Sequence, residues 1–134
     1  MPLIRIDVIE GRSERQLLAI GNAVHHALGE CLGVPERDRF QIITEHSRAR
    51  LTYDPAYLGV ERTEGIVFVQ VFLSEGRSTE QKSAFYSRAA HLIAADAKIR
   101  PEDVTIVLIE NKREDWSFGN GVAQYLTLPK EQWN

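Results

Sequence analysis

The chain has 134 residues, which is enough for one compact domain with its own hydrophobic core. Its formal net charge is −3 and its basic residues are scattered, so the clustered basic face typical of nucleic-acid binding is not predicted. No apolar run approaches the roughly 20 residues that span a bilayer, and the first residues lack the pattern of a secretory signal. The single cysteine, Cys31, excludes an internal disulfide and fits a reduced, cytoplasmic setting.

The chain contains the same short turn twice. EGRSERQ begins at Glu10 and EGRSTEQ begins at Glu75, an offset of 65 positions. The offset is nearly constant over the flanking residues, since Glu45 corresponds to Glu110. Shared turn residues at a nearly fixed offset indicate a repeated unit. We therefore predict one domain, residues 1–134, with pseudo-repeat halves 2–46 and 66–110 and a tail 111–134.

The first half has the pattern of a strand, a helix and a second strand. Residues 4–8 alternate between apolar and charged side chains, as in a strand with one buried face. Ser13 then begins a helix, and Gln16 three residues later completes the signature of a capping box. The helix carries an apolar stripe at i, i+3, i+4 spacing and ends at Gly33. Residues 40–45 follow as the second predicted strand.

The second half repeats this order. Residues 66–73 are more uniformly apolar, which suggests a strand covered on both faces. Ser78 and Gln81 repeat the capping box at the start of a second helix, and Pro101 follows that helix. Residues 104–110 complete the second β-α-β unit.

The segments outside the repeat are predicted as loops and turns. The linker 47–65 contains an Asp54-Pro55 pair and two glycines. In the tail, the dipeptide at Asn120 and Gly121 is a strong hairpin signal, so we predict a C-terminal hairpin.

Together these elements predict an α+β fold. Because parallel strands need a crossover, each half supplies two parallel strands and the helix between them. The two units would pair into a four-stranded mixed sheet with both helices on one face. The other face would then be apolar and uncovered, so we predict a homo-oligomer.

Pro2 is a candidate proton carrier. A small residue after the initiator methionine favours removal of Met1, which would leave a secondary amine at the start of the first strand. An unperturbed α-amino group titrates at about 7.7–8.0, close to neutrality, where proton transfer is most effective. Many chains begin Met-Pro without any catalytic use of the proline, so this residue alone decides little.

Arg12 and Arg77 occupy the same place in the two repeated turns. Each precedes a helix start, beside unpaired backbone N–H groups and the positive end of the helix dipole. A guanidinium at such a place suits a carboxylate. The alternative is a solvated arginine that pairs with a nearby glutamate.

Several motifs carry a resemblance to a known family. PLIRIDVIEGRSERQ, GVPERDRFQIITEH, VFVQV, QKSAFY and DWSFGNGVAQ resemble the tautomerase superfamily, and most closely its malonate semialdehyde decarboxylase-like group. The resemblance covers nearly the whole chain. Members of this superfamily use an amino-terminal proline, and the longer ones fuse two β-α-β units in one chain and assemble as trimers. A homotrimer is therefore implied.

The resemblance also implies roles for particular residues. Pro2 matches the catalytic proline, Asp38 an acidic residue that works with the proline and a water, and Arg77 an arginine that binds the substrate carboxylate. Trp116 and Phe118 match an aromatic wall beside the proline.

Two of the matched residues carry less weight. Arg12 matches a carboxylate-binding arginine of the short members, and it ranks below Arg77 because that copy can lack an active site in fused enzymes. Without the resemblance, Asp38 is better explained as a cap for the turn before its strand.

The implied activity is enzymatic keto–enol tautomerisation of a small keto or enol carboxylic acid, with hydratase activity as a side reaction. The decarboxylase has two arginines near the start of the second helix, whereas LSEGRSTE carries Glu75 and one arginine. This departure favours a tautomerase. The alternatives are a malonate semialdehyde decarboxylase, which is a carboxy-lyase, and a non-catalytic trimeric binding protein. The expected partner is a small carboxylate substrate, with no nucleic acid and no membrane.

No metal and no other cofactor are predicted. His25 and His26 are neighbours on a helix and point about 100° apart, so they do not easily ligate one metal. The sequence has no H-x-x-x-H or C-x-x-C pattern.

Overall fold

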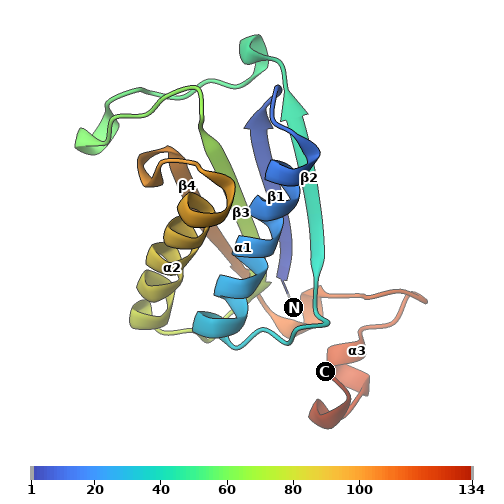
Figure 1. Cartoon of the computed structure of the whole chain (residues 1–134). Coiled ribbons are helices and arrows are strands. Elements are labelled where there is room, and N and C mark those ends of the chain that lie inside the picture. The colour runs from blue at the N-terminus through green and yellow to red at the C-terminus, as the bar shows by residue number, and fades with distance from the viewer. Residues whose placement is uncertain (1, 134) are drawn as a thin grey trace.

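The structure, a computed structural model, describes residues 2–133. A four-stranded sheet has the strand order β2-β1-β3-β4, and two long helices lie on one of its faces (Figure 1). The elements are β1 (Pro2–Ile9), α1 (Glu14–Leu32), β2 (Phe40–His46), β3 (Val67–Ser74), α2 (Thr79–Ala97), β4 (Val104–Asn111) and the short α3 (Gln124–Thr127).

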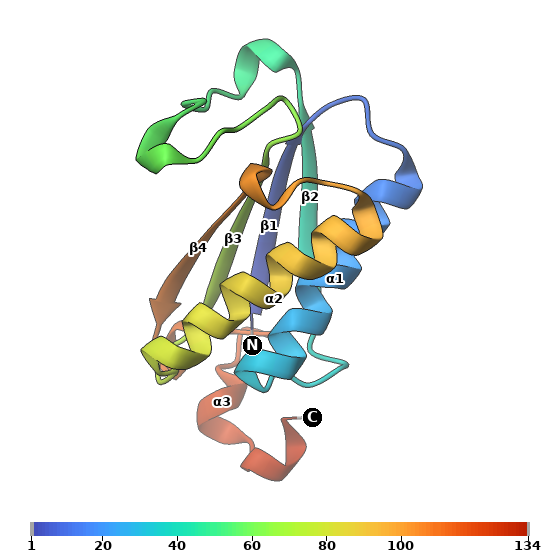
Figure 2. The same ribbon diagram turned by 60° about the vertical axis from the view of Figure 1, so that its left-hand side comes forward.

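The strand pairing confirms the two β-α-β units. β1 is parallel to β2, and β3 is parallel to β4, so each half contributes one parallel pair with its crossover helix. The halves meet at the centre of the sheet, where β1 and β3 pair antiparallel. Turning the molecule shows α1 and α2 packed side by side across the same face (Figure 2).

Both predicted capping boxes form. Ser13 Oγ accepts a hydrogen bond from the Gln16 backbone N–H at 3.2 Å, and Ser78 Oγ accepts one from Gln81 at 3.1 Å. In each case the glutamine side chain returns a bond to the serine backbone N–H, so two otherwise unpaired donors are satisfied. α1 ends at Gly33, whose φ of 69° is a left-handed conformation that glycine adopts without steric cost.

The main core lies between the sheet and the two helices. The even-numbered residues of β1 face the helices, and Ile4, Ile6 and Val8 have no exposed surface. Leu28 of α1 and Phe85 of α2 are likewise fully buried. The strict alternation along β1 explains why its apolar and charged residues could be assigned to opposite faces from the sequence.

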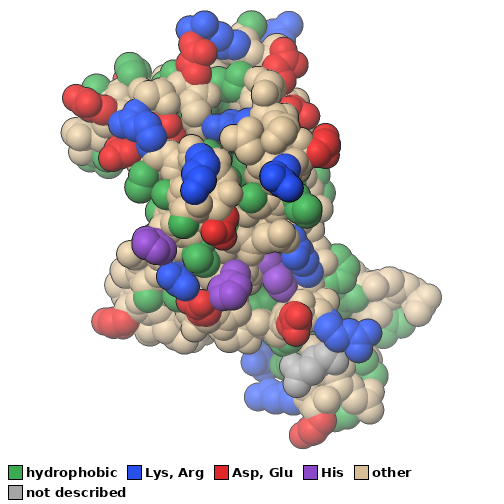
Figure 3. Space-filling model, viewed as in Figure 1, with side chains coloured by type: hydrophobic (Ala, Val, Ile, Leu, Met, Phe, Trp, Pro, Cys, Tyr) green, Lys and Arg blue, Asp and Glu red, His purple; other side chains and the backbone are tan. Residues whose placement is uncertain are grey.

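The opposite face of the sheet is open in the single chain. Phe40 and Val107 are each 47% exposed, and Ile42 is 41% exposed. Phe68 and Phe72 of β3 are half-buried on the same face, so β3 is completely covered only toward the helices. By contrast, the helix-bearing side shows acidic and basic side chains interspersed (Figure 3), as expected for a solvent-facing surface.

The predicted C-terminal hairpin is wrong, although its turn forms. Asn120 and Gly121 have φ values of 59° and 67°, and the Val122 N–H bonds to the Gly119 carbonyl at 3.3 Å. No strand flanks this turn within the described residues. Instead, the Gln124 side chain bonds to the Phe118 N–H and the Gly119 carbonyl, so a side chain occupies the polar groups that a strand ladder would use.

The linker packs partly against the open side of the sheet. Leu51 and Ile66 form a small second cluster with Ile9, and the segment between them projects beyond the sheet (Figure 1). Within the described part of the chain, no helix has the length and apolar character needed to cross a membrane.

Leu28→Ala should lower the free energy of unfolding by about 2–5 kcal/mol, because it empties a fully buried position of α1. Leu18→Ala is the matched control on the same helix, since Leu18 is 61% exposed, and it should change stability by about 0.5 kcal/mol or less. Urea unfolding at one fixed protein concentration measures both. Equal losses for the two variants would contradict this placement of the core.

Candidate active site

Four segments meet at one edge of the sheet. Pro2 pairs with Leu73 across β1 and β3, so β1 begins where β3 ends. Ser74 pairs with Asn111, so β4 ends there too. β2 begins at the same edge, because Phe40 is its first residue and pairs with the second residue of β1. The predicted site residues Pro2, Asp38, Arg77, Trp116 and Phe118 all lie on or next to these segments.

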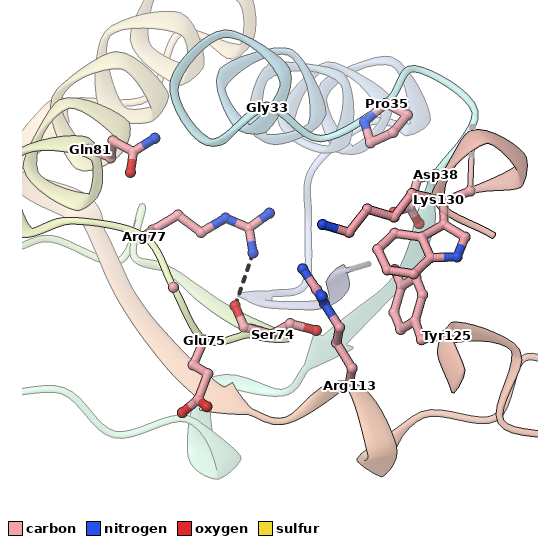
Figure 4. Close-up of a pocket in the computed structure, with 12 residues that line it drawn as sticks. Gly33, Pro35, Asp38, Ser74, Glu75, Arg77, Gln81, Arg113, Tyr125 and Lys130 are labelled. Carbon is pink, nitrogen blue, oxygen red and sulfur yellow. Dashed lines mark hydrogen bonds between the residues drawn. The ribbon is translucent and has the colours of Figure 1, made fainter. Parts of the chain in front are cut away.

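The side chains at this edge line two neighbouring cavities. Asp38 and Arg77 line the first, which has a volume of about 400 Å³ (Figure 4). Phe118 lines the second, of about 360 Å³, and Asp38 contributes to both. Pro2 is buried at the start of β1, and neither Pro2 nor Trp116 lines either of these two cavities. Trp116 stacks on Phe118 with ring centroids 5.7 Å apart and planes 10° apart, so the two rings form one aromatic wall.

Arg77 is held by backbone carbonyls. Its Nη1 donates to the Ser74 carbonyl at 2.9 Å, and Nε and Nη2 donate to the Leu32 carbonyl at 3.4 and 3.3 Å. Gly76, with φ of 122°, makes the turn that directs the side chain toward the carbonyl end of α1. A guanidinium has five N–H donors, so both terminal nitrogens keep donors for a ligand. The arginine is thus fixed in place and still able to bind a carboxylate.

The tail extends the aromatic wall. Tyr125 of α3 meets Phe118 edge-on at 4.9 Å and Trp133 at 4.7 Å. The Trp116 indole N–H donates to Asn111 Oδ1 at 2.7 Å, which ties the wall to the end of β4. A water-poor surface therefore lies beside the charged groups, where it strengthens their interactions.

The Tyr125 phenol titrates unusually late. Burial, and secondarily the negative charge of Asp38, raise the pKa of Tyr125 to about 12, while the charges of Arg77 and Arg113 oppose the shift. The phenol is therefore a neutral hydrogen-bonding group at physiological pH. Asp38, Arg77 and Arg113 line the first cavity together with Tyr125.

The sequence reasoning missed several lining residues. Arg113, Lys130 and Tyr125 all line the first cavity and all belong to the tail. Arg113 lies two residues after the end of β4, and the shared edge of parallel strands was the signal that could have found it. The sequence predicted a single arginine in the pocket, because Glu75 stands beside Arg77 near the start of the second helix. This expectation is corrected, since Arg113 is a second arginine that reaches the pocket from elsewhere in the chain.

Ser74 presents a further polar group. Its side chain is 7% exposed, lines the first cavity, and its hydroxyl is buried without a hydrogen-bond partner among the described residues. Buried hydroxyls are normally paired, so an unpaired one at a cavity wall indicates a place for a ligand group.

Arg12 lies at the opposite end of β1, away from this pocket. Its Nη2 donates to the Gly65 carbonyl at 2.7 Å. Asp103, which is 65 positions after Asp38, is 2% exposed there and accepts bonds from the Thr63 backbone N–H and hydroxyl at 2.7 and 2.6 Å. Arg12 and Asp103 are the repeat counterparts of Arg77 and Asp38, and both form hydrogen bonds with the linker.

No group of three or more His, Cys, Asp or Glu residues within positions 2–133 is placed to hold a metal ion. The sheet edge instead brings together a fixed cation, a carboxylate and an aromatic wall. The volumes of the two cavities lie in the range of pockets that bind small molecules.

Comparisons with known proteins agree with this class. Two family models described as "Tautomerase enzyme" match residues 2–59 and 38–119. The curated relative "Probable tautomerase YusQ" of Bacillus subtilis (strain 168) is 42% identical over 126 residues, which cover 94% of this chain and 99% of YusQ. The chain belongs to the tautomerase family, and it is an enzyme of that superfamily.

Solved structures of related enzymes are similar over most of the chain. The FG41 malonate semialdehyde decarboxylase inhibited by 3-bromopropiolate has a TM-score of 0.88 and 42% identity, covering 93% of this chain and 95% of that one. Another malonate semialdehyde decarboxylase, studied for its decarboxylase and hydratase activities, has a TM-score of 0.88 and 35% identity, covering 93% and 96%. A symmetric trimer of fused 4-OT shares the fold, with a TM-score of 0.77 at 21% identity and coverage of 95% and 99%.

The raised pKa of Tyr125 predicts a pH effect on stability. A tyrosine in the unfolded chain loses its proton near pH 10, whereas folded Tyr125 keeps it to about 12. Between these values the folded state binds more protons, so stability should fall as pH rises through this window. Tyr125→Phe should make the fall shallower, while Tyr57→Phe, at a 64% exposed position, should not. Chemical unfolding between about pH 9.5 and 11.5 measures the slopes, and identical slopes for all three proteins would refute the assignment.

Proposed function

We propose that this chain interconverts the enol and keto forms of a small oxo carboxylic acid, with Pro2 as the proton carrier. The observation that carries the proposal is the meeting of a buried proline, a carboxylate, a fixed arginine and an aromatic wall at one sheet edge. Tautomerisation needs only these parts: a proton acceptor near neutrality, a cation and a dry wall.

The proton balance is simple. Removal of Met1 makes the Pro2 nitrogen a secondary amine. The enol O–H bond breaks as its proton passes to that nitrogen, and the oxygen electron pair forms the C=O bond. The electrons of the C=C bond then take the proton back from the nitrogen, forming a C–H bond. Nothing is oxidised or reduced, and no cofactor is needed.

The other groups support this step from their positions. Arg77 binds the substrate carboxylate and stabilises the developing enolate oxygen with the donors that the carbonyls leave unused. Ser74 offers its unpaired hydroxyl to the same substrate. Asp38 orients a water molecule or tunes the basicity of Pro2. Trp116 and Phe118 exclude water and so strengthen these interactions.

Decarboxylation of malonate semialdehyde is the second candidate. Two observations favour it: the likeness to two such decarboxylases, and Arg113 beside Arg77 in one cavity. A protonated Pro2 would give its proton to the carbonyl oxygen while the bond between the α-carbon and the carboxylate breaks and carbon dioxide leaves. The released electron pair would form an enol, whose carbon then takes up a proton from water as the enol oxygen returns its proton to Pro2, which gives the aldehyde. Hydration of a related acid would use the same cationic proline as a side reaction.

We also propose that the enzyme is a homotrimer in the cytoplasm. The exposed apolar residues Phe40, Ile42 and Val107 leave one sheet face that another copy would cover, and a fold relative is a symmetric trimer. The lone Cys31 fits a reducing compartment. A trimer that only binds ligands is the non-catalytic alternative.

Pro2→Ala should lower kcat/KM for phenylenolpyruvate ketonisation by at least about 100-fold, because the proton carrier is lost. Loss of the enol absorbance measures the rate, and carbon dioxide release from malonate semialdehyde tests the second candidate. Light scattering should give the same mass for the variant as for the natural chain.

Intact-mass spectrometry of the natural protein is the complementary check on the same proline. The mass should lack the initiator methionine. If the natural protein keeps Met1, or if Pro2→Ala has full activity, Pro2 is not the proton carrier and the proposed chemistry is refuted.

Arg77→Gln should lower kcat/KM by about 100-fold or more, since it removes the cation that binds and stabilises the substrate. Arg12→Gln is the matched control, because Arg12 has the same place in the other repeat and donates to the linker at Gly65. It should change kcat/KM by less than about twofold while lowering thermal stability, since it leaves the Gly65 carbonyl without its bond. Similar activity losses for both variants would overturn the assignment of one site to one end of the sheet.

A further inference from the structure

The first cavity gathers more positive charge than one carboxylate needs. Arg77, Arg113 and Lys130 line it, and their charged ends turn toward the same space (Figure 4). Glu75 also belongs to the lining, but its carboxylate points away from that space (Figure 4). Arg113 and Lys130 are exposed side chains that reach this space from the tail. Like charges directed at one space repel, and a bound anion relieves that repulsion.

Arg113 is held at the cavity by an aromatic platform. Its guanidinium carbon lies 5.0 Å from the centroid of the Trp133 ring. Trp133 is fixed in turn by its indole N–H, which donates to the Leu128 carbonyl at 3.2 Å, and by its edge contact with Tyr125. A cation on an aromatic face keeps its N–H edge free for an acceptor, so Arg113 is positioned while its hydrogen-bond donors remain available.

Arg113 has no carboxylate partner within residues 2–133. The ion pairs of this region use other residues, namely Lys82 with Glu110. The buried, unpaired hydroxyl of Ser74 points to the Arg113 side of the cavity (Figure 4). A fixed cation and an unpaired buried hydroxyl on one wall are the complement of an anionic ligand group.

We propose that Arg113, assisted by Lys130, binds a second anionic group of the substrate, so that the enzyme prefers small oxo acids with two carboxylates. One carboxylate lies on Arg77, which enters from the start of α2. The other lies on Arg113, which enters from the segment after β4. This inference rests on the proposed function, because it names the substrate class of the same pocket.

The likeness to the decarboxylases makes the position of this cation informative. The turn before α2 holds Glu75 and one arginine, Arg77, and a second arginine, Arg113, reaches the same cavity from the segment after β4. Two cations from different segments hold two separated carboxylates, whereas adjacent arginines on one turn crowd around one. The specificity therefore depends on where the second arginine lies as well as on its presence.

Binding of unreactive acids tests the proposal without requiring catalysis. Titration calorimetry would compare succinate with butyrate, and malonate with propionate, in a buffer free of competing carboxylates. The natural enzyme should bind the diacid at least about tenfold more tightly than the matched monoacid, as expected for one additional charge-assisted contact. Arg113→Gln should remove most of that preference and change monoacid affinity by less than about threefold. Lys130→Gln should give a smaller loss in the same direction.

Lys112→Gln is the matched control, since Lys112 is the exposed neighbour of Arg113 and does not line either cavity at this edge. It should leave both affinities unchanged. A kinetic comparison adds a second readout: Arg113→Gln should reduce kcat/KM for 2-hydroxymuconate, with two carboxylates, about tenfold more than for phenylenolpyruvate, with one.

The outcomes separate this inference from the proposed function. Selective diacid binding without any enol turnover would support Arg113 and refute the tautomerase activity. Turnover with no preference for diacids, equal losses of both acids in Arg113→Gln, or no binding of either acid at tens of millimolar would overturn the role of Arg113. Circular dichroism of each variant ensures that the comparison is made on folded protein.

Discussion

The antiparallel pairing of β1 with β3 is the constraint on which the rest of the molecule depends. Each half alone is a parallel pair with one helix, and its ladder would end at an open strand. Joining the halves through β1 and β3 places the buried strands at the centre, where Ile4 opposes Val71 and Ile6 opposes Val69. The same pairing sets Pro2 opposite Leu73, so the first residue of one half meets the turn of the other. The pocket is thus a consequence of how the halves join.

This joining produces two related ends of the sheet, and the corresponding arginines at the two ends make different contacts. At one end, Arg77 bonds to nearby carbonyls and keeps donors toward a cavity. At the other, Arg12 and Asp103 bond to the linker residues Gly65 and Thr63. The linker can close only the end at which β3 begins, because it is covalently attached there. The tail leaves from the other end and builds an aromatic wall instead of filling the space.

Local signals predicted most of the fold. Ser13 and Ser78 were identified as helix caps because a capping box is decided by residues three positions apart, and both boxes form. The strands followed from a period of two, and the pairing of units followed from the repeat. The hairpin failed because a turn at Asn120 and Gly121 fixes only four residues, while the flanking strands need a partner ladder that the side chain of Gln124 replaces.

Only some residues of the candidate site could be predicted from the sequence, for a physical reason. Asp38 and Arg77 could be assigned because the family resemblance covers their motifs, and both line one cavity. Arg113 and Tyr125 could not, because their place depends on where the 22-residue stretch after β4, residues 112–133, folds back. The motif DWSFGNGVAQ identified Trp116 and Phe118 within that stretch, but no periodicity there predicts the direction in which the stretch folds. Only the shared edge of β3 and β4, a long-range feature of the sheet, brings it to the pocket.

The case of Glu75 shows how a local comparison can mislead about charge. A reading along the sequence finds one arginine lost near the second helix and concludes that the pocket is less positive. Electrostatic energy depends on distances in space, so an arginine 38 positions after Glu75 contributes equally well if its segment returns to the same cavity. Here Arg113 does so on the platform of Trp133. Arg77 and Arg113 thus approach the cavity from different segments, and a ligand with separated charges senses these two directions.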